Sequence, residues 1–307
     1  MTTSATARVP AKINLSLGVG PIRDDGYHAL ATVYQALDVH DEVRAVTVDD
    51  SDDITVSVHI EADRMVESID VPTDDDNLAV RAAKLLRDST GAEGGARLAI
   101  RKVIPVAGGM AGGSADAAAA LVACNEMWGT GLARQELEQL AAKLGSDVPF
   151  LLHGGNAIGG GRGETISPVL ARGSYFWVVA VASQGLATRD VYAEFDRLNA
   201  GADLPQPEAP DDLLAALRAG DATELGASLS NDLTDAALSL RPELRGTLDL
   251  GLEAEALGAV VSGSGPTCLF LAEDEAHSLD IAMALAGAGV CADVIQARGP
   301  VPGARLI

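Results

Sequence analysis

The segment PVAGGMAGGSADAA, residues 105–118, decides the expected fold of this 307-residue chain because it places four glycines between a strand and a helix. The strand pattern RLAIRKV precedes it, and an Ala-rich helix is expected from about residue 114 to 128. Glycine lets the backbone adopt positive φ and approach a ligand closely. The helix would present unpaired N–H groups and its positive dipole end, which suit an anion. The segment indicates an anion-binding turn, with a turn that only packs a helix on a sheet as the alternative.

Two common phosphate-binding patterns do not fit this segment. Gly108 and Gly113 have the spacing of the GxxxxGK[ST] P-loop, but Ser114 stands where that pattern requires Lys. The dinucleotide pattern GxGxxG does not fit the segment either. An anion would therefore have to be held by backbone N–H groups, the helix N-terminus and a few placed cations.

Three motifs together resemble those of the GHMP kinases, which include the galacto-, homoserine, mevalonate and phosphomevalonate kinases. The glycine segment looks like their central motif. PAKINL at 10–15 looks like the first, and VVSGSGPTCLFL at 260–271 looks like the third, a turn that closes over the nucleotide. The motifs stand in the family's order and span almost the whole chain. The resemblance implies a two-domain α+β GHMP kinase fold with the active site in the cleft between the domains, and it implies ATP and Mg²⁺ as cofactors.

Four shorter segments resemble one group within that family, the diphosphocytidyl-methylerythritol kinases. They are RDDGYHAL at 23–30, GSDVPFLL at 145–152, GGGRGE at 159–164 and TRDVY at 188–192. The resemblance implies transfer of the γ-phosphoryl group of ATP to the 2-hydroxyl of a cytidine diphosphate-linked methylerythritol, in the non-mevalonate route to isoprenoids. A homoserine or mevalonate kinase, and a nucleotide-binding sensor of the same fold without activity, are the alternatives.

Composition and charge restrict the classes of partner. A net charge of −22 with no basic stripe argues against nucleic acid or an anionic membrane. The first residues show no secretory signal, and no apolar run approaches the roughly 20 residues of a membrane span. The three cysteines lie far apart without a CxxC pair, which favours a reducing cytoplasm over a disulfide framework or zinc site. A small-molecule substrate is therefore expected.

Hydrophobic periodicity gives the expected elements. In VPAKINLSL, one strand face is apolar from Val9 to Leu17, and the other carries Lys12 with two further polar residues. Asp76 is expected to cap a helix that begins near residue 78. YFWVVAVA reads as a buried strand, and a helix is expected near 274–287. We expect two domains, residues 1–168 with the glycine segment and residues 169–307.

Lys12 and Asp147 are the candidate catalytic residues by match to the Lys/Asp pair of the GHMP kinases. Lys12 lies on an otherwise apolar strand, where a cation is unusual unless it is paired. Asp147 follows the helix stop at Gly145 and precedes Pro149, so it is held in a turn. Asp147 would act as the base and Lys12 would keep it ionised. The alternatives are a lysine that reaches solvent and an aspartate that only caps a turn.

The resemblance also implies the residues that hold ATP. Ser114 would reach the β- and γ-phosphates or the magnesium ion through its hydroxyl, and Asp116 is either a second metal ligand or a solvated first-turn acid. The glycines of the third motif would face the nucleotide, with a ligand-free hairpin turn as the alternative. The expected nucleotide contacts are Pro105, Val106, Ala107, Gly108, Gly109, Met110, Ala111, Gly112, Gly113, Ser114, Ala115, Gly263 and Gly265.

On the acceptor side, the resemblance implies a cytosine ring stacked between aromatic side chains. Tyr27, His28 and Tyr192 stand at the matching positions, and aromatic residues make up only 3% of this chain. Asn14 would contact the methylerythritol or the diphosphate, and Thr188 would support the same pocket. For Tyr192 the alternative is packing in a helix core, and for His28 it is an ordinary loop histidine.

Overall fold

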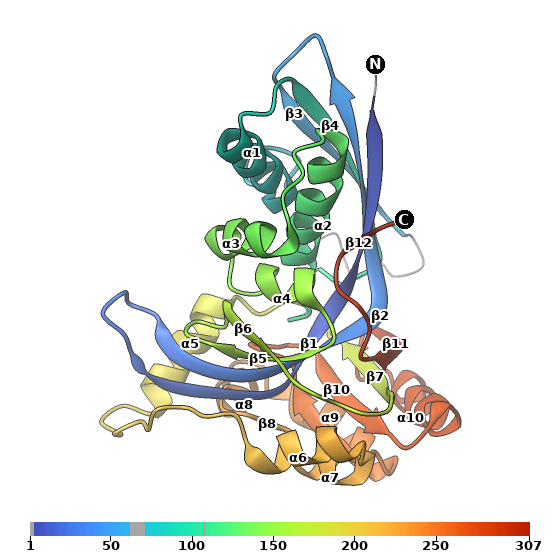
Figure 1. Ribbon diagram of the computed structural model, residues 1–307. Coiled ribbons are helices and arrows are strands. Elements are labelled where there is room, and N and C mark those ends of the chain that lie inside the picture. The colour runs from blue at the N-terminus through green and yellow to red at the C-terminus, as the bar shows by residue number, and fades with distance from the viewer. Residues whose placement is uncertain (1–2, 62–70, 107–108) are drawn as a thin grey trace.

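The computed structural model describes residues 3–61, 71–106 and 109–307. Two β-sheets with packed helices give the α+β architecture that the sequence predicts. Figure 1 shows an upper body built on β1 to β4 and a lower body built on β7 and β9 to β11. The long hairpin of β1 and β2 runs from the top of the upper body to the side of the lower one.

The described residues place eight strands in the first sheet, in the order β12-β1-β2-β4-β3, with β5, β6 and β8 attached to it. Most pairs are antiparallel, but β3 runs parallel to β4 and β8 runs parallel to β1. The strands are β1 (Ser4–Ile22), β2 (His28–Val48), β3 (Ile54–Ile60), β4 (Gly95–Lys102), β5 (Asn156–Gly160), β6 (Thr165–Pro168), β8 (Ser230–Asn231) and β12 (Arg305–Leu306).

Strand β1 is buried on both faces. The predicted apolar face is confirmed, since the alternate residues from Val9 to Leu17 are buried. The polar face is buried as well, because Met110 and Gly263 lie against Lys12. The β1–β2 register also shifts at three places along the hairpin. Such shifts bend and twist a ribbon, which fits the curved hairpin in Figure 1.

Helices α1 (Leu78–Thr90), α2 (Gly112–Met127), α3 (Arg134–Leu144) and α4 (Val148–His153) belong to the upper body. Alanine dominates α2 because the helix packs against both α1 and the β1–β2 hairpin, where small side chains allow close approach. The predicted cap of α1 is wrong by one residue. Asn77, not Asp76, accepts a hydrogen bond from the Ala79 amide at 2.9 Å, which is the role of an N-cap side chain.

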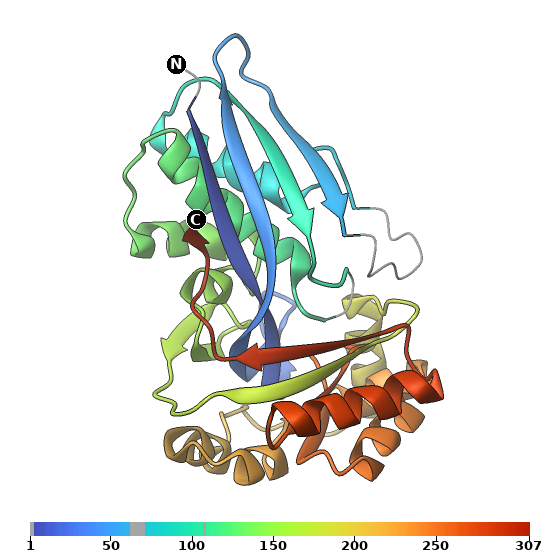
Figure 2. The ribbon, with the colours of Figure 1, turned by 90° about the vertical axis from the view of Figure 1, so that its right-hand side faces the viewer.

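The second sheet has the order β11-β7-β10-β9, and the predicted buried strand is its β7. Trp177 of β7 is fully buried and donates to the Gln35 side chain of β2 at 2.7 Å, which ties the two sheets together. Figure 2 shows α10 lying along this sheet. The elements are β7 (Tyr175–Val181), β9 (Gly258–Val261), β10 (Cys268–Ala272), β11 (Asp293–Gly299), α5 (Thr188–Leu198), α6 (Asp211–Ala219), α7 (Ala222–Ala227), α8 (Thr234–Leu240), α9 (Glu243–Glu253) and α10 (Glu275–Ala288).

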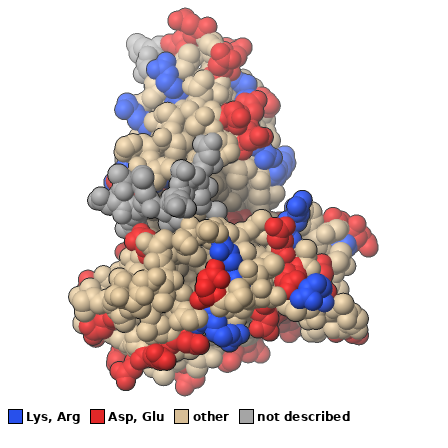
Figure 3. All heavy atoms as spheres, turned by 180° about the vertical axis from the view of Figure 1, so that it is seen from behind, with Lys and Arg blue, Asp and Glu red and all other residues tan. Residues whose placement is uncertain are grey.

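The chain passes from the first sheet to the second between β6 and β7, but β8 and β12 return to the first sheet. The division at residue 168 stays a prediction. Among the described residues, no helix is long and apolar enough to cross a membrane. On the face seen in Figure 3, Lys and Arg stand singly or in small groups among Asp and Glu. That face therefore offers no basic stripe of the kind that nucleic acid requires.

Candidate active site

A cavity of about 910 Å³ lies where the two bodies meet. Its wall combines β1, β2, the start of α2 and the turn before α4 with α5 and the turn between β9 and β10. Fourteen of the predicted positions line it: Lys12, Asn14, Tyr27, His28, Gly109, Ala111, Gly112, Gly113, Ser114, Asp147, Thr188, Tyr192, Gly263 and Gly265. A volume of this order suits a ligand of drug size or somewhat larger.

Lys12 and Asp147 meet at this cavity. The Lys12 Nζ atom lies 3.7 Å from Asp147 Oδ2, and the Asp147 side chain keeps 29% of its surface exposed while Lys12 is buried. Asp147 occupies the N-cap position of α4, and the proline that follows favours the start of a helix. The pair is longer than a close ion pair of about 2.8 Å. Lys12 therefore stands near the carboxylate without enclosing it.

Asn14 holds the Lys12 ammonium from the same face of β1. Lys12 Nζ donates to Asn14 Oδ1 at 2.7 Å, and Asn14 Nδ2 donates to the Thr32 hydroxyl at 2.8 Å. That hydroxyl in turn donates to the Ser16 carbonyl at 2.7 Å, so the orientation of the amide is fixed. A buried lysine is costly unless its donors are satisfied, and this chain of bonds satisfies one of them.

Tyr34 belongs to the same cluster, although it lies in none of the predicted motifs. Its hydroxyl donates to Asp147 Oδ1 at 3.1 Å, and its ring stacks on Phe150 with centroids 4.8 Å apart. The Lys12 ammonium lies 5.6 Å from the ring centroid. Burial, followed by the neighbouring Asp147 charge, raises the pKa of Tyr34 well above its usual value. The hydroxyl therefore remains a hydrogen-bond donor to the carboxylate at neutral pH.

The glycine segment reaches the cavity through a left-handed turn before α2. Gly109 and Ala111 have φ of 73° and 59°, and a Cβ on Gly109 would lie 2.4 Å from the Ser262 carbonyl oxygen. Gly112, Gly113 and Ser114 open the helix and line the cavity. The first amides of a helix have no partner within the helix and attract anions. This end of α2 can therefore bind phosphate.

Not every predicted nucleotide position faces the cavity. Met110 and Ala115 are fully buried in the core, and Pro105 and Val106 precede the turn without lining the cavity. Ala107 and Gly108 lie outside the described residues. In a turn that packs a helix on a sheet, some residues line the cavity and others point into the hydrophobic core. A mixture of the two is therefore expected in this segment.

The third motif closes over the first. Gly263 has φ of 58°, and a Cβ there would lie 3.2 Å from Asn14 Oδ1 and 3.5 Å from Lys12 Nζ. The turn is held by Asn231 of β8, a residue that lies outside the predicted motifs. Its side-chain amide donates to the carbonyls of Val261 and Gly263, both at 2.7 Å. Asn231 thus fixes the turn beside the strand that carries Lys12.

His28 and Tyr192 form the aromatic end of the cavity. Their rings stack with centroids 5.4 Å apart and an interplanar angle of 23°. The His28 ring is anchored on both sides, with Nδ1 2.8 Å from the Gly20 carbonyl oxygen and Nε2 3.1 Å from Asp196 Oδ1. Burial, with a smaller contribution from Asp147, raises the pKa of Tyr192. A planar ligand cannot enter between these two rings unless they separate.

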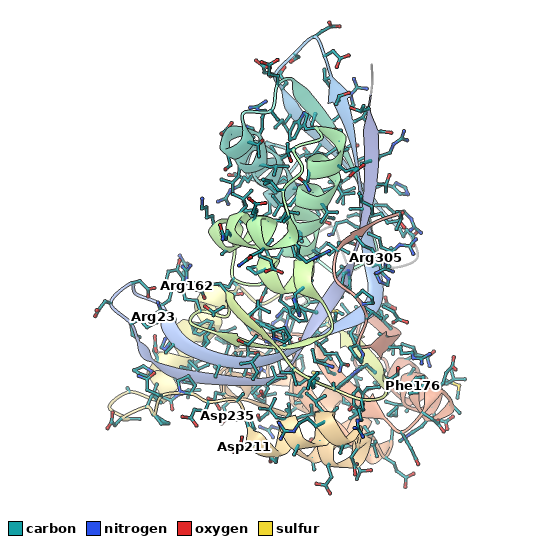
Figure 4. The ribbon with its side chains drawn as sticks, in the orientation of Figure 1. Arg23, Arg162, Phe176, Asp211, Asp235 and Arg305 are labelled. Atoms are coloured by element: carbon teal, nitrogen blue, oxygen red, sulfur yellow. The ribbon has the colours of Figure 1, made fainter. Side chains whose placement is uncertain are left out.

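Tyr27 contributes a second, exposed aromatic surface. It keeps 57% of its surface accessible, and the Arg162 guanidinium lies 4.9 Å from its ring centroid. Figure 4 places Arg162 beside the free end of the β1–β2 hairpin, on the same side as Arg23. A guanidinium stacked on an aromatic ring gains from the cation–π interaction. Arg162 also lines the cavity, so it brings a positive charge to the end where the aromatic rings stand.

Thr188 begins α5 and meets the third motif. Its hydroxyl lies 3.0 Å from the Ser264 hydroxyl, and the contact is exposed. Thr188 thus links the helix that carries Tyr192 to the turn beside Lys12.

The expectation of a solvated Asp116 is wrong. Asp116 is buried, and its Oδ2 accepts a bond of 2.7 Å from Lys102. The residues that the structure describes contain no group of three or more His, Cys, Asp and Glu arranged to hold a metal. Ser114, the predicted ligand, lines the cavity. Mg²⁺ commonly takes few protein ligands beside substrate phosphates and waters, and this donor set fits such a site.

Comparison with protein families gives matches in both bodies of the chain. The model of the GHMP kinases N terminal domain matches residues 77–155, and that of the GHMP kinases C terminal domain matches residues 213–290. The 4-diphosphocytidyl-2-C-methyl-D-erythritol kinase of Thermobifida fusca is 52% identical over 99% of both chains. The enzyme of the same name from Salinispora tropica is 56% identical over 97% of this chain and 93% of that protein.

Solved structures give the same picture of the fold. A crystal structure of 4-(cytidine 5'-diphospho)-2C-methyl-D-erythritol kinase superposes with a TM-score of 0.74 at 31% identity, covering 97% of this chain and 98% of the other. A homoserine kinase from Cytophaga hutchinsonii superposes with a TM-score of 0.75 over 99% and 98%, but at 19% identity. At 19% identity, the similarity to the homoserine kinase shows only a shared fold.

Proposed function

The chain belongs to the GHMP kinases and, within them, to the 4-diphosphocytidyl-2-C-methyl-D-erythritol kinases, and from this premise we propose how its residues carry out the transfer. The reaction moves the γ-phosphoryl group of ATP to the 2-hydroxyl of 4-diphosphocytidyl-2-C-methyl-D-erythritol, a step of the non-mevalonate isoprenoid pathway. The observation that supports the proposed roles most strongly is the approach of Lys12 and Asp147 to 3.7 Å at the cavity wall.

Asp147 takes the proton of the acceptor hydroxyl. Phosphoryl transfer needs an oriented nucleophile and a base within hydrogen-bond reach of its proton. Asp147 has one oxygen held by Tyr34 and the other facing Lys12 at a distance that leaves it accessible. Lys12 stabilises the negative charge on the carboxylate and on the alkoxide as it develops. Holding the two substrates in line can supply about 7–11 kcal/mol of the barrier.

The nucleotide lies along the start of α2. Gly112, Gly113 and Ser114 open the helix and line the cavity, and their amides bind the β- and γ-phosphates. The turn at Gly263 and Gly265 covers the phosphates from the other body. Ser114 would hold a magnesium ion, which supplies charge neutralisation on the phosphate oxygens when bound.

The cytidine end of the acceptor binds at the aromatic end of the cavity. Since His28 and Tyr192 stack on each other, the exposed ring of Tyr27 is the aromatic surface that the cytosine ring can reach without separating them. Stacking of a base on an aromatic side chain is worth about 1–3 kcal/mol. Asn14, fixed beside Lys12, contacts the methylerythritol near the reacting hydroxyl.

We place the enzyme in the cytoplasm. Cys124, Cys268 and Cys291 are all free, and the first two are buried. Burial raises the pKa of both buried thiols to about 12, so they remain protonated and unreactive at neutral pH. Unpaired cysteines of this kind suit a reducing compartment.

A coupled assay of ADP release, run with each acceptor in turn, tests the substrate. We expect turnover with 4-diphosphocytidyl-2-C-methyl-D-erythritol and none above background with homoserine or mevalonate. Turnover confined to homoserine or mevalonate would overturn the substrate assignment. ATP binding without turnover on any of the three acceptors would instead identify a nucleotide sensor.

A further inference from the structure

A sealed ion cluster lies behind the glycine segment, outside the cavity wall. The Lys102 ammonium at the end of β4 donates to Asp41 Oδ2 at 2.6 Å and to Asp116 Oδ2 at 2.7 Å. The exposed fraction of each of these three side chains is 3% or less. Burial lowers the pKa of Lys102, but Asp116 and Asp41 together raise it above its usual value, so the side chain stays an ammonium.

The cluster connects three elements at the point where the glycine segment leaves the sheet and enters the helix. Asp41 lies on β2, Lys102 on β4 and Asp116 on α2. The second oxygen of Asp41 accepts the backbone amides of Val103 and Ile104, at 2.6 and 2.8 Å. These residues directly follow β4 and lead into the glycine segment.

At the other end of the segment, the same lysine contacts the start of α2. Lys102 Nζ lies 3.4 Å from the Gly112 carbonyl oxygen, and a Cβ on Gly112 would lie 3.3 Å from the ammonium. Gly112 is also part of the cavity wall. The cluster therefore holds residues on both sides of the glycine turn, and one of those residues faces the proposed phosphate site.

The cluster does not act by attracting phosphate. One ammonium faces two acidic side chains, and burial raises the pKa of Asp116 well above its usual value. The cluster therefore carries no excess positive charge, and Lys102 does not line the cavity. Taking charges out of water is expensive, and an apolar replacement of similar volume is often as stable. Neither folding stability nor attraction of ATP therefore accounts for this buried ion cluster. The backbone geometry that it fixes does account for it.

We propose that Asp41, Lys102 and Asp116 are positioning residues for the nucleotide. They fix Val103 and Ile104 at one end of the glycine segment and Gly112 at the other, so that the amides at the start of α2 are aimed at the triphosphate. This inference rests on the proposed placement of ATP at that helix end. It assigns no direct contact with substrate to any of the three side chains.

The first test is Asp41→Asn, which keeps the volume of the side chain but removes one of the two oxygens that serve Lys102 and the backbone amides. We expect the KM for ATP to rise by about tenfold, the equivalent of ~1.4 kcal/mol, while the KM for the cytidyl acceptor stays within about twofold. Calorimetric titration with a non-hydrolysable ATP analogue should show the same weakening without any turnover. An unchanged ATP affinity in the folded variant would overturn the proposal.

The second test is Asp116→Asn, which leaves every contact of Asp41 intact and so covers the case in which Asp41→Asn does not fold. Positioning predicts a rise of roughly threefold or more in the KM for ATP, because a neutral amide holds the start of α2 more weakly than a carboxylate does. If the cluster acted by charge, removing a negative group would lower that KM. A fall or no change would therefore contradict the proposal.

The matched control is Ile281→Ala, which removes a fully buried side chain from α10, a helix with no residue in the cavity lining. It should lower the melting temperature and leave both KM values unchanged, which separates positioning from general loss of stability. The same assays also distinguish failure of the proposed function. A wild-type enzyme that does not turn over the cytidyl acceptor would refute the function, whereas normal turnover with unaltered ATP affinity in both Asn variants would refute the positioning role alone.

Discussion

In the part of the chain that the structure describes, two lysine–aspartate clusters involve lysines of the first sheet, and they differ in how far their side chains are exposed to water. At Lys12 the nearest carboxylate oxygen is 3.7 Å away, and the Asp147 side chain is 29% exposed. At Lys102 two carboxylates approach to 2.6 and 2.7 Å, and the Asp41 side chain is 0% exposed. The same pair of residue types thus gives a sealed structural cluster in one place and an open pair in the other. Of the two clusters, the one at Lys12 and Asp147 leaves a carboxylate that an alcohol can reach from the cavity. Proton transfer from the alcohol to a base requires such access.

The largest effect should follow from changing the open carboxylate. Asp147→Asn removes the base but keeps the size of the side chain and the acceptor for Tyr34. We expect kcat to fall by about 10²- to 10⁴-fold, because that is the usual contribution of a positioned base, while the affinity for ATP changes little. Single-turnover kinetics and nucleotide titration measure the two quantities.

Asp235→Asn is the control, since it makes the same change of charge at an exposed residue of α8, which is labelled in Figure 4. Its kcat should equal that of the wild type. Unchanged turnover in Asp147→Asn would exclude Asp147 as the base. The exposure of the Lys12–Asp147 pair would then have no catalytic meaning.

The next largest effect should come from the sealed lysine. Lys102→Met leaves two buried carboxylates without a counterion, and such a loss usually costs about 3–5 kcal/mol of folding free energy. Lys12→Met leaves one carboxylate that is partly hydrated, so we expect a cost below about 1 kcal/mol together with a loss of turnover. Urea unfolding followed by circular dichroism compares the two. Equal loss of folding free energy in both variants would show that the difference in solvent exposure between the two clusters does not affect their contribution to stability.

Tyr34→Phe sharpens the comparison at an intermediate size of effect. The variant keeps the stack on Phe150 and removes the hydroxyl that holds Asp147 Oδ1. We expect kcat to fall by roughly tenfold, or ~1.4 kcal/mol, with little change in stability. The control is Tyr175→Phe, which removes a hydroxyl that donates to the Arg172 carbonyl outside the cavity lining. A kcat for Tyr34→Phe equal to that of the control would show that the open carboxylate needs no such support.

Much of the fold could be predicted from the sequence because periodicity reports which faces are buried. The burial of one face of β1 follows from alternate spacing, and the buried strand β7 follows from a continuous apolar run. The helix predicted near 274–287 is confirmed as α10. The cap of α1 was placed one residue early because Asp76 and Asn77 are both good capping residues, and only the backbone decides between them. The return of β8 and β12 to the first sheet left no local signal, since each strand is only two residues long.

Site residues could be predicted from the sequence where they belong to a recognisable motif. Site residues outside any motif could not be predicted. Lys12 and Asp147 stand in motifs, whereas Tyr34 and Asn231 are ordinary strand residues whose roles come from partners far along the chain. Asp116 shows a second kind of error. Helix α2 begins at Gly112, so Asp116 lies beyond the first turn and not within it as predicted. Its burial depends on Lys102, which only the fold brings near.

The smallest effect is expected at the most exposed contact. Thr188→Val removes one hydroxyl from the pair with Ser264, whose atoms remain accessible to water. Water can replace an exposed partner, so we expect the free energy of unfolding to change by less than about 0.5 kcal/mol. The KM for ATP should rise by no more than roughly threefold, or ~0.6 kcal/mol, which is near the low end of the net contribution of a hydrogen bond because water can replace the lost partner. Thr188→Ser keeps the hydroxyl and should match the wild type in both measurements. If Thr188→Val instead destabilised the chain as much as Lys102→Met, closure from solvent would not be the variable that ranks these polar contacts.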